Sequence, residues 1–536
     1  MDNEILQEYD ALPDAERVSE GLRETGYTFN TAIADIVDNS IAANATKVEL
    51  TLNQEPSGKI TVYVMDNGCG MDKVGLVNAL TYGSAKRKDP SSLGKFGLGL
   101  KTSATSFCRT ISLISRTSGD NTIRKMQWDI DKAPVKGWKV QEYAPTEEEI
   151  DLLEDITDGG SGTVVVCENC DKIIKSYKDH STEKAAFTKK KNDLEFHLSL
   201  VFGRFLDPSF TDAKTVSITL NGKALDAWDP FCKNNPKTLA YKPTELVVDT
   251  PNKKTATCII TNYIIPRRDE FDTPAERDNA HISNDMQGFY IYREHRLIYY
   301  GQWLGMWSNE PHYSLHRVEF SFNHTLDEEF NVDIKKSVVT LNDEIYQIIK
   351  EQLLSAPRKQ ARKRYDTGVS KKVDKTSANA HDASNKNIEN NAPMAEKAKV
   401  VITGQNQVSL TNANGTFKHA IEVEAPDSIK KNQRRIIPVD SLLGNQLWEP
   451  VIVPPNEHAI KINTSHDYYK KIYYPLLGQN VMISGLDALL WSLAEAELTA
   501  TNDNTSEAFE DLRTWTSMIL KRMLKDLPEP DLDDND

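Results

Sequence analysis

The sequence predicts an α+β protein built from several domains. Its 536 residues exceed what one hydrophobic core usually serves. Near the N-terminus, a helical pattern is followed by a strand hairpin, a glycine-rich loop, a second helix and further strands, an order typical of an α+β sandwich. Hydrophobic residues make up 39% and charged residues 27% of the chain, as in ordinary folded proteins, so the composition excludes a wholly disordered chain.

The first predicted element is an amphipathic helix at residues 27–43. Its apolar residues recur at helical spacing, and Asn30 or Thr31 is placed to cap its start. Residues 47–52 and 60–65 then alternate apolar and polar side chains around a polar turn. This alternation predicts a β-hairpin.

A stretch rich in Gly and Ser follows at residues 83–99 and leads into an apolar run, residues 100–108. We expect this run to form a helix that begins at the glycines. Together with the preceding elements, it belongs to the first predicted domain, residues 1–182. The further strands expected in this domain are residues 110–115, 126–129 and 163–167.

A second domain is predicted at residues 183–356. It begins with a helical stretch at residues 183–205, followed by two short strands around an Asn221-Gly222 turn. A helix at residues 342–354 closes the domain. The strands expected in between are residues 258–265, 288–300 and 317–322.

Residues 357–400 are polar and short of aromatic residues, which predicts a flexible linker. Beyond it, residues 401–527 are predicted to form a C-terminal interaction or dimerisation domain that ends in a helical hairpin, because two stretches near its end are amphipathic. An acidic tail, residues 528–536, is expected to be disordered. The linker starts with a basic run: Arg358, Lys359, Arg362, Lys363, Arg364, Lys371 and Lys372.

The cysteine and hydropathy patterns predict a reducing, cytoplasmic environment. Six scattered cysteines are too few for a disulfide framework. Cys167 and Cys170 form a lone CxxC without the further ligands of a tetrahedral zinc site, so we favour a buried strand there. No apolar run is long enough to cross a bilayer, and the polar, acidic start is unlike a signal peptide. We therefore expect no membrane association.

Three short motifs contain candidate chemistry, and the first is IADIVDNSIAANAT. In it, Asp35 and Asn39 are four residues apart and share one helix face. A carboxylate at that place can hold a water molecule while the amide oxygen ligates Mg²⁺. Most such pairs lie on a solvated face, so this motif is weak alone.

The second motif, VMDNGCGM, places Asp66 at a strand end, where Gly68 and Gly70 let the backbone approach a planar ligand. An ionised carboxylate is an acceptor, as the exocyclic amine of adenine requires. The third motif, GKFGLGL at residues 94–100, presents backbone N–H groups at a helix start to phosphate. It is neither a P-loop, because GxxxxGK[ST] is absent, nor a dinucleotide-binding loop, because it does not follow the first strand. Either motif alone also fits an ordinary turn.

In order and spacing, the three motifs resemble the N, G1 and G2 boxes of the Bergerat-fold (GHKL) ATPases, the superfamily of gyrase, large ATP-dependent heat-shock chaperones, histidine kinases and MutL. GGSGT at residues 159–163 resembles the superfamily's last ATP-site motif. IADIVDNSIAANAT, YGSAKR and GKFGLGLKTSA are most similar to the MORC and bacterial MutL-like ATPases. This resemblance covers the first predicted domain.

The second domain resembles the S5-like transducer of MutL, gyrase and MORC proteins in LNGKALDAWDPF, GFYIYREHRLI and FNVDIKKSVVTL. In such transducers a loop lysine reaches the γ-phosphate. Lys336 fits that place best and Lys335 is the alternative, while a solvated loop residue is the plain interpretation of either. The resemblance thus implies a Bergerat-fold ATPase sandwich, an S5-like transducer domain and a mixed, partly helical C-terminal domain.

The resemblance also implies ATP and Mg²⁺ as cofactors. Asp35 and Lys336 would be catalytic, with Asp35 as the water-activating base; Asn39 would bind Mg²⁺, and Asp66 and Thr163 would contact adenine. The family usually has Glu at position 35, and the shorter Asp withdraws the carboxylate by about 1.5 Å, so we expect slow ATP hydrolysis. The other implied nucleotide-binding residues are Gly68, Gly70, Met71, Ser84, Gly94, Lys95, Phe96, Gly97, Leu98, Gly99 and Lys101, for the last of which a solvent-facing side chain is the alternative.

Finally, the resemblance implies a mode of action. Residues 72–99 would form a lid over ATP that lets two ATPase domains form a homodimer, and hydrolysis would remove the γ-phosphate contacts. We expect an ATP-gated clamp on double-stranded DNA, with the basic linker near its interior, in a bacterial restriction or phage-defence system with protein partners encoded nearby.

The formal net charge of −15 weighs against the DNA hypothesis, because a polyanion then needs a local basic surface. The alternative is a chaperone-like or scaffolding ATPase that acts on protein partners. A histidine kinase is a weaker alternative, because its catalytic domain usually comes last. In the C-terminal domain, His466 lies among tyrosines in INTSHDYYKKIYYPLLG, where we favour aromatic packing over a base or metal site and assign no chemistry.

Overall fold

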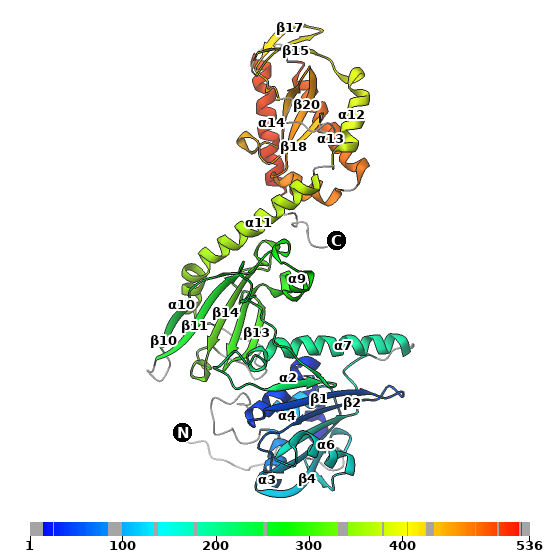
Figure 1. Cartoon of the computed structure of the whole chain (residues 1–536), viewed down its shortest axis with the longest axis vertical. Helices are drawn as coiled ribbons and strands as arrows, with labels where there is room; N and C mark the ends of the chain where they lie inside the picture. Colours follow the sequence, from blue (N-terminus) through cyan, green and yellow to red (C-terminus); the bar gives the residue numbers. More distant parts are fainter. Residues whose placement is uncertain are drawn as a thin grey trace, which may run out of the picture. The chain divides into compact units, whose positions relative to one another are not determined.

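The chain divides into two compact units, Met1–Lys359 and Gln360–Asp536. Both mix helices with β-sheets, which confirms the predicted α+β class (Figure 1). The computed structural model describes residues 14–24, 26–83, 99–132, 138–175, 180–249, 255–330, 341–377, 380–404, 406–424, 434–477, 479–500, 503–524 and 527.

The first unit begins with an eight-stranded sheet in the order β5-β4-β3-β6-β2-β1-β7-β8, in which only β1 and β7 are parallel neighbours. Its strands are β1 (Lys47–Gln54), β2 (Ile60–Asp66), β3 (Thr110–Thr117), β4 (Asp120–Asp129), β5 (Gln141–Tyr143), β6 (Gly162–Glu168), β7 (Ser217–Leu220) and β8 (Lys223–Ala224). The accompanying helices are α1 (Ala15–Arg23), α2 (Phe29–Ala42), α3 (Lys73–Ala79), α4 (Gly99–Thr105), α6 (Glu147–Thr157), α7 (His180–Val201) and α8 (Gly203–Leu206).

Both faces of this sheet are covered. Val164 and Val166 of β6 join an apolar cluster with Leu153 of α6. Val165 and Cys167, which alternate with them, join a larger cluster that includes buried residues of α1, α2, α3, α4 and α7. The alternation of side chains along a strand therefore separates two cores, and α2 lies in the larger one.

The predicted first helix and hairpin are present as α2, β1 and β2, but the helix cap differs. The hydroxyl of Thr28 accepts a hydrogen bond from the Thr31 N–H, and the Thr31 hydroxyl accepts one from the Thr28 N–H. Thr28 is thus the cap, and Thr31 completes a reciprocal capping box, so the prediction of Asn30 or Thr31 as the cap was wrong by a few positions.

The hairpin at Asn221-Gly222 forms as predicted, with positive φ at both residues. Its strands, β7 and β8, nevertheless extend the first sheet through β1, although we expected them in the second domain. A hairpin pattern in the sequence does not reveal which distant strand its edge will pair with. The first sheet therefore extends past the boundary predicted at residue 182.

A six-stranded sheet follows in the order β10-β11-β14-β12-β13, with β9 paired to the end of β11. Phe289 and Ile291 face a core closed by residues 343–353, whereas Tyr290 and Tyr292 face a second core that includes Leu200 of α7. The elements are β9 (Leu239–Ala240), β10 (Thr244–Asp249), β11 (Thr255–Ile264), α9 (Pro274–Asn279), β12 (Gly288–Arg293), β13 (Arg296–Gln302), β14 (His316–Phe322), α10 (Asp343–Gln347) and the π-helical segment Ile348–Leu353.

The segment predicted as a flexible linker is largely helical. Helix α11 spans Ser355–Ser377 and α12 spans Asp382–Ala395. Arg358 is buried, with its guanidinium carbon 3.3 Å from the Tyr313 ring centroid and 4.3 Å from that of Trp307. Ile388 of α12 lies in the core of the second unit. The polar composition concealed these helices, because the apolar groups that cover them come from other segments.

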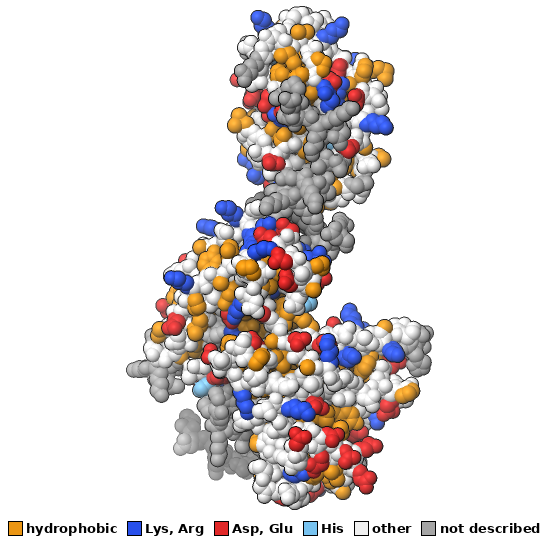
Figure 2. Space-filling view, in the orientation of Figure 1, with side chains coloured by type: hydrophobic (Ala, Val, Ile, Leu, Met, Phe, Trp, Pro, Cys, Tyr) orange, Lys and Arg blue, Asp and Glu red, His pale blue; other side chains and the backbone are white. Residues whose placement is uncertain are grey.

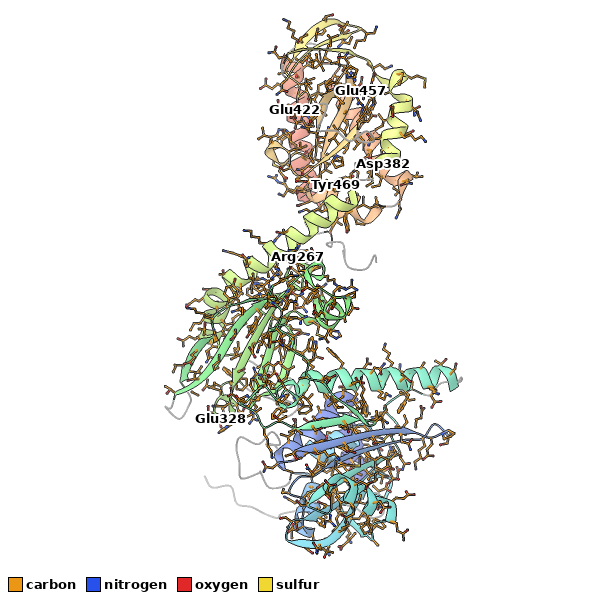
Figure 3. All side chains as sticks on the ribbon, viewed as in Figure 1. Arg267, Glu328, Asp382, Glu422, Glu457 and Tyr469 are labelled. Atoms are coloured by element: carbon orange, nitrogen blue, oxygen red, sulfur yellow. The ribbon has the colours of Figure 1, made fainter. Side chains whose placement is uncertain are left out.

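The second unit contains two three-stranded sheets, β15-β16-β17 and β18-β20-β19. Trp448, Tyr469, Tyr473 and Trp491 lie in its core; Figure 3 labels Tyr469 there. The two amphipathic helices predicted near the end of the chain are α13 (Asn480–Glu497) and α14 (Asp503–Met523). The strands are β15 (Lys399–Gly404), β16 (Gln407–Asn412), β17 (Gly415–His419), β18 (Ile436–Val439), β19 (Trp448–Val453) and β20 (Glu457–Asn463).

Within the described ranges, no helix has the length and apolar character that a membrane span requires. The predicted acidic tail at 528–536 lies outside the described residues.

Candidate nucleotide site

Helix α2 places Asp35, Asn39 and Ser40 close together. Asp35 and Ser40 are buried, and Asn39 is half-buried. The side-chain nitrogen of Asn39 donates a hydrogen bond of 3.0 Å to the main-chain carbonyl of Asp35. The amide oxygen of Asn39 is therefore its atom with the chemistry to ligate a hard cation.

Asp66 ends β2 and is tied to this helix. One carboxylate oxygen accepts a 2.7 Å hydrogen bond from the Ser40 hydroxyl, and the other accepts a 2.9 Å hydrogen bond from the Gly68 N–H. Burial raises the pKa of Asp66 above its ordinary value, while these two hydrogen bonds act in the opposite direction. The result is a buried, oriented carboxylate at the junction of α2 and the sheet.

The register of the sheet brings Thr163 beside Asp66. The two residues are paired across β2 and β6, and Ser115 of β3 is the partner of Thr163 on its other side. The Ser115 hydroxyl donates to the Gly162 carbonyl at 2.7 Å, accepts from the Met71 N–H at 2.9 Å, and lies 2.9 Å from the Thr163 hydroxyl. The motifs at residues 64–71 and 159–163 therefore meet at one point of the sheet.

Glycine is required around this point because the backbone packs against itself. Gly70 has a φ of 67°, and a Cβ there would lie 1.9 Å from the Arg116 carbonyl oxygen. A Cβ on Gly162 would lie 2.2 Å from the Asp66 carbonyl oxygen. These glycines let two strand ends approach each other, and the contact of Gly68 and Gly70 with a ligand stays a prediction.

The carboxylate of Asp35 is held from two directions. The Tyr27 hydroxyl donates a 2.8 Å hydrogen bond to Oδ2. Arg296 of β13 in the second sheet places Nη2 3.8 Å from Oδ1. The same guanidinium has its Nε 3.1 Å from Oδ2 of Asp38. The candidate base is therefore in contact with the segment before α2 and with the second sheet of the first unit.

Lys101 in the first turn of α4 points into a cage of aromatic rings. Its Nζ lies 3.2 Å from the ring centroid of Trp128, 4.1 Å from that of Tyr82 and 5.6 Å from that of Trp138. Burial lowers the pKa of Lys101 to about 7, while the ring faces favour the charged form. The alternative of a solvent-facing Lys101 was wrong, because the three rings come from separate segments and only the fold assembles them. Its contact with phosphate stays a prediction.

The phosphate side of the predicted site lies mainly outside the described residues. Gly99 is described, as the first residue of α4, and α3 occupies part of the predicted lid. The roles of the remaining residues stay predictions. Those outside the described residues are Ser84, Gly94, Lys95, Phe96, Gly97, Leu98, Lys335 and Lys336.

The sequence interpretation missed three residues that hold the site: Tyr27, Ser40 and Arg296. Ser40 lies three and four residues after the apolar Val37 and Ile36 on α2, so its place on the buried helix face could have suggested a buried partner. Tyr27 lies just before the helix and needs the fold to reach Asp35. Nothing in the sequence links Arg296 with α2, because this contact joins a helix near the N-terminus to a strand far along the chain, and Arg296 and Asp38 are 258 residues apart.

Two other groups that the sequence singled out take part in packing. Cys167 is buried in β6, and the Cys170 thiol donates to its carbonyl oxygen over 3.4 Å. His466 is buried, where its Nδ1 accepts a 3.1 Å hydrogen bond from the Tyr468 N–H and its Nε2 lies 3.2 Å from the Ser517 carbonyl oxygen. The rings of Tyr469 and Tyr473 stack on each other at 4.9 Å between centroids. Over the part of the chain that the structure describes, no three His, Cys, Asp or Glu side chains are grouped to hold a metal ion.

Residues 27–163 match the family of histidine kinase-, DNA gyrase B- and HSP90-like ATPases. Mouse (Mus musculus) ATPase MORC2B is 23% identical over 172 residues, which cover 26% of this chain and 17% of that protein. Protein MICRORCHIDIA 6 of Arabidopsis thaliana is 28% identical over 97 residues, which cover 17% of this chain and 14% of that protein. The chain thus spans less than a fifth of the length of these two curated relatives.

Among solved structures, the crystal structure of the N-terminal domain of a DNA repair protein aligns with 65% of this chain and 98% of that chain. The sequence identity is 16% and the TM-score 0.38. The family match includes Asp35, Asn39, Asp66 and Thr163; the fold pairs Asp66 with Thr163 and ties Asp66 through Ser40 to α2, the helix that carries Asp35 and Asn39.

Proposed function

We propose that this chain, whose residues 27–163 form a GHKL-type ATPase domain, hydrolyses ATP slowly with the help of Mg²⁺ at the site around Asp66. One observation carries the proposal: the register pairs Asp66 with Thr163 while the Ser40 hydroxyl ties Asp66 to α2. The acceptor for adenine and the helix that bears Asp35 are thereby fixed relative to each other.

Recognition of adenine follows from the chemistry of Asp66. Its ionised carboxylate accepts a hydrogen bond from the exocyclic amine, and the hydroxyl of Thr163 supplies a second polar group beside it. Ser40 and Gly68 hold the carboxylate in one orientation, so little rotational freedom is lost when the base binds. A base without an amine at this place would leave the buried Asp66 carboxylate without that hydrogen bond, and this cost discriminates in favour of adenine.

Hydrolysis needs a base beside the phosphates. Asp35 takes a proton from the attacking water as the terminal phosphoryl group is transferred to the water oxygen, and ADP leaves. Tyr27 donates to one oxygen of Asp35 and so fixes the carboxylate plane. The amide oxygen of Asn39 would hold Mg²⁺, which when bound supplies positive charge to the phosphate oxygens.

The test compares Asp35→Asn and Asn39→Ala with the wild type, and uses the exposed Asp158→Asn as control. We expect Asp35→Asn to lower the hydrolysis rate about 10²- to 10⁴-fold, the usual contribution of a general base, while it still binds a non-hydrolysable ATP analogue. Asn39→Ala weakens Mg²⁺-dependent binding as well. A wild type that neither binds nor hydrolyses ATP contradicts the proposal.

We further propose that ATP brings two copies together as a clamp on double-stranded DNA. Four lysines of α7 supply the local basic surface that a chain of net charge −15 needs. They form no ion pair with another residue in the described ranges, and Figure 2 shows basic side chains along this helix. The four are Lys184, Lys189, Lys190 and Lys191.

Duplex binding measured by anisotropy at several salt concentrations tests this surface. Replacing three of these lysines, Lys184, Lys189 and Lys190, by Gln is expected to weaken binding and to reduce the slope of log K against log salt by about 2.7, from roughly 0.9 per phosphate contact. The control replaces three lysines that are paired with acids: Lys73, Lys223 and Lys237. Absence of salt-dependent binding in the wild type contradicts the DNA proposal, and with it the role proposed in restriction or phage defence.

The second candidate is an ATPase that acts on protein partners, and an apolar stripe on α14 favours it. Trp515 is 58% exposed and Met523 76% exposed, and Leu512 and Ile519 are also exposed between and beside them. An apolar surface of this kind is typical of protein contacts. If the wild type hydrolyses ATP but ignores duplex DNA at low salt, this candidate becomes the better one.

A further inference from the structure

The turn between β12 and β13 directs one arginine of the second sheet towards the first. Glu294 and His295 both have positive φ, 47° and 68°, so the chain reverses within two residues and β13 begins at Arg296. The Arg296 side chain is 6% exposed and lies against α2, the helix of the candidate base. A short, rigid turn therefore fixes where this guanidinium lies.

Arg296 contacts two carboxylates of α2. Its Nε lies 3.2 Å from Oδ1 and 3.1 Å from Oδ2 of Asp38. Its Nη2 lies 3.8 Å from Oδ1 of Asp35, whose other oxygen is held by Tyr27. The third nitrogen, Nη1, donates to the carbonyl of Leu297 at 3.0 Å. Each nitrogen of the guanidinium thus has a defined contact.

The contact with Arg296 brings positive charge to two neighbouring buried carboxylates. Asp35 and Asp38 are three residues apart on one helix and both are buried, so their like charges repel each other in a poorly solvated place. His197 lies nearby, but burial lowers its pKa to about 4 and it is neutral at pH 7. Arg296 supplies the positive charge, and its planar guanidinium presents separate nitrogens to the two carboxylates in a fixed geometry, whereas a lysine ammonium is a single point charge on a flexible stem.

We infer that Arg296 is a positioning residue for ATP hydrolysis, which couples the second sheet to the catalytic carboxylate of Asp35 through the Arg296–Asp38 pair. This inference rests on the proposed role of Asp35 as the base. Any movement of the β12–β13 turn against α2 changes the distance from Nη2 to Asp35. The second sheet therefore sets the orientation of the base without touching ATP.

The experiment measures kcat, KM, analogue affinity and the thermal unfolding midpoint for Arg296→Met, Arg296→Lys and the double variant Arg296→Met/Asp38→Asn. We expect Arg296→Met to lower kcat by roughly 10- to 100-fold, the cost of misplacing a catalytic group by about 1 Å, with KM and analogue affinity unchanged. Arg296→Lys keeps the charge without the fork and recovers only part of kcat. Arg277→Met, which removes a partly exposed arginine paired with Asp278, is the matched control.

The double variant separates positioning from stability. It also removes the buried negative charge of Asp38, which loses its contact with Arg296 in Arg296→Met, so its unfolding midpoint is expected to recover while kcat stays low. Recovery of kcat together with the midpoint overturns the inference, because Arg296 then acts through stability alone. An Asp35→Asn variant that still hydrolyses ATP contradicts the proposed base instead; an inactive Asp35→Asn beside a fully active Arg296→Met contradicts only the inference.

Discussion

Both compact units bury polar side chains, but they use them differently. In the second unit, His381 Nδ1 lies 2.6 Å from Asp487 Oδ2, and its Nε2 lies 2.9 Å from the Tyr469 hydroxyl. All three residues are buried, and they join three separate segments of that unit. In the first unit, Asp66 is equally buried, but its partners are a small hydroxyl and a backbone N–H at the end of a strand.

The difference shows that burial of a polar group does not by itself mark a ligand site. The His381 cluster links helices and loop through large side chains, so its hydrogen bonds stabilise the fold. Asp66 lies at a strand end beside glycines, within the part of the chain that matches an ATPase family. We expect substitutions in the His381 cluster to lower the stability of the fold and substitutions at Asp66 to lower the affinity for ATP.

The largest expected effect is that of Asp487→Asn on the second unit. It weakens a buried, hydrogen-bonded pair, and breaking such a pair costs about 3–5 kcal/mol. Hydrogen exchange of peptides from α13 should speed up, while the ATP hydrolysis rate stays unchanged. An equal loss of ATP hydrolysis would remove the distinction between the two units.

Asp66→Asn is expected to have the opposite pattern, a loss of ATP affinity without a loss of stability. The variant places a side-chain amide where the carboxylate accepts, so ATP affinity should fall by about 1.5–3 kcal/mol, the worth of a hydrogen bond to a charged group, while the unfolding midpoint changes little. Calorimetric binding of an ATP analogue measures this loss. Unchanged affinity would place adenine elsewhere.

The pH dependence of ATP affinity in the wild type also tests the role of the Asp66 carboxylate. Because burial raises the pKa of Asp66, its carboxylate takes up a proton at a higher pH than an ordinary Asp. Protonation removes the acceptor, so ATP affinity should decline as the pH falls through this raised pKa and recover above it. Asp66→Asn should lack this decline.

Lys101→Met is expected to change the free energy of unfolding by only about 1–2 kcal/mol. The change is small because the attraction between the ammonium group and the ring faces offsets much of the cost of burying the charge. With its pKa lowered to about 7, below that of the unfolded chain, Lys101 favours folding at high pH, and this contribution is lost as the pH falls through 7. Tryptophan fluorescence of the wild type should titrate near pH 7. A titration that persists in Lys101→Met would exclude Lys101 as its source.

The smallest expected effect is that of Thr163→Val. It removes one hydroxyl beside Asp66 and should weaken ATP binding by about 0.5–1.5 kcal/mol, the net worth of one neutral hydrogen bond. Thr163→Ser keeps the hydroxyl and should bind like the wild type. Equal affinities for all three would show that Thr163 only fills space between β2 and β3.

Much of the fold could be predicted because its signals are local. Helical spacing predicted α2 and alternation predicted β1 and β2, since side-chain periodicity follows directly from backbone geometry. The shared helix face of Asp35 and Asn39 was predicted for the same reason, because they are four residues apart on α2, and their roles at a nucleotide site stay predictions. The helix that begins in the predicted flexible linker was not predicted, because the aromatic rings that bury its Arg358 come from residues 307 and 313.

The sequence by itself determined the α+β class and the early elements α2, β1 and β2, because these depend on neighbours along the chain. The contacts of Asp35, Asn39, Asp66 and Thr163 with ATP stay predictions. Only the tertiary structure decided that β7 extends the first sheet, that Lys101 enters an aromatic cage and that Arg296 contacts Asp35 and Asp38. Each of these joins segments far apart in the chain. Strand register and burial choose such partners, and no local pattern encodes them.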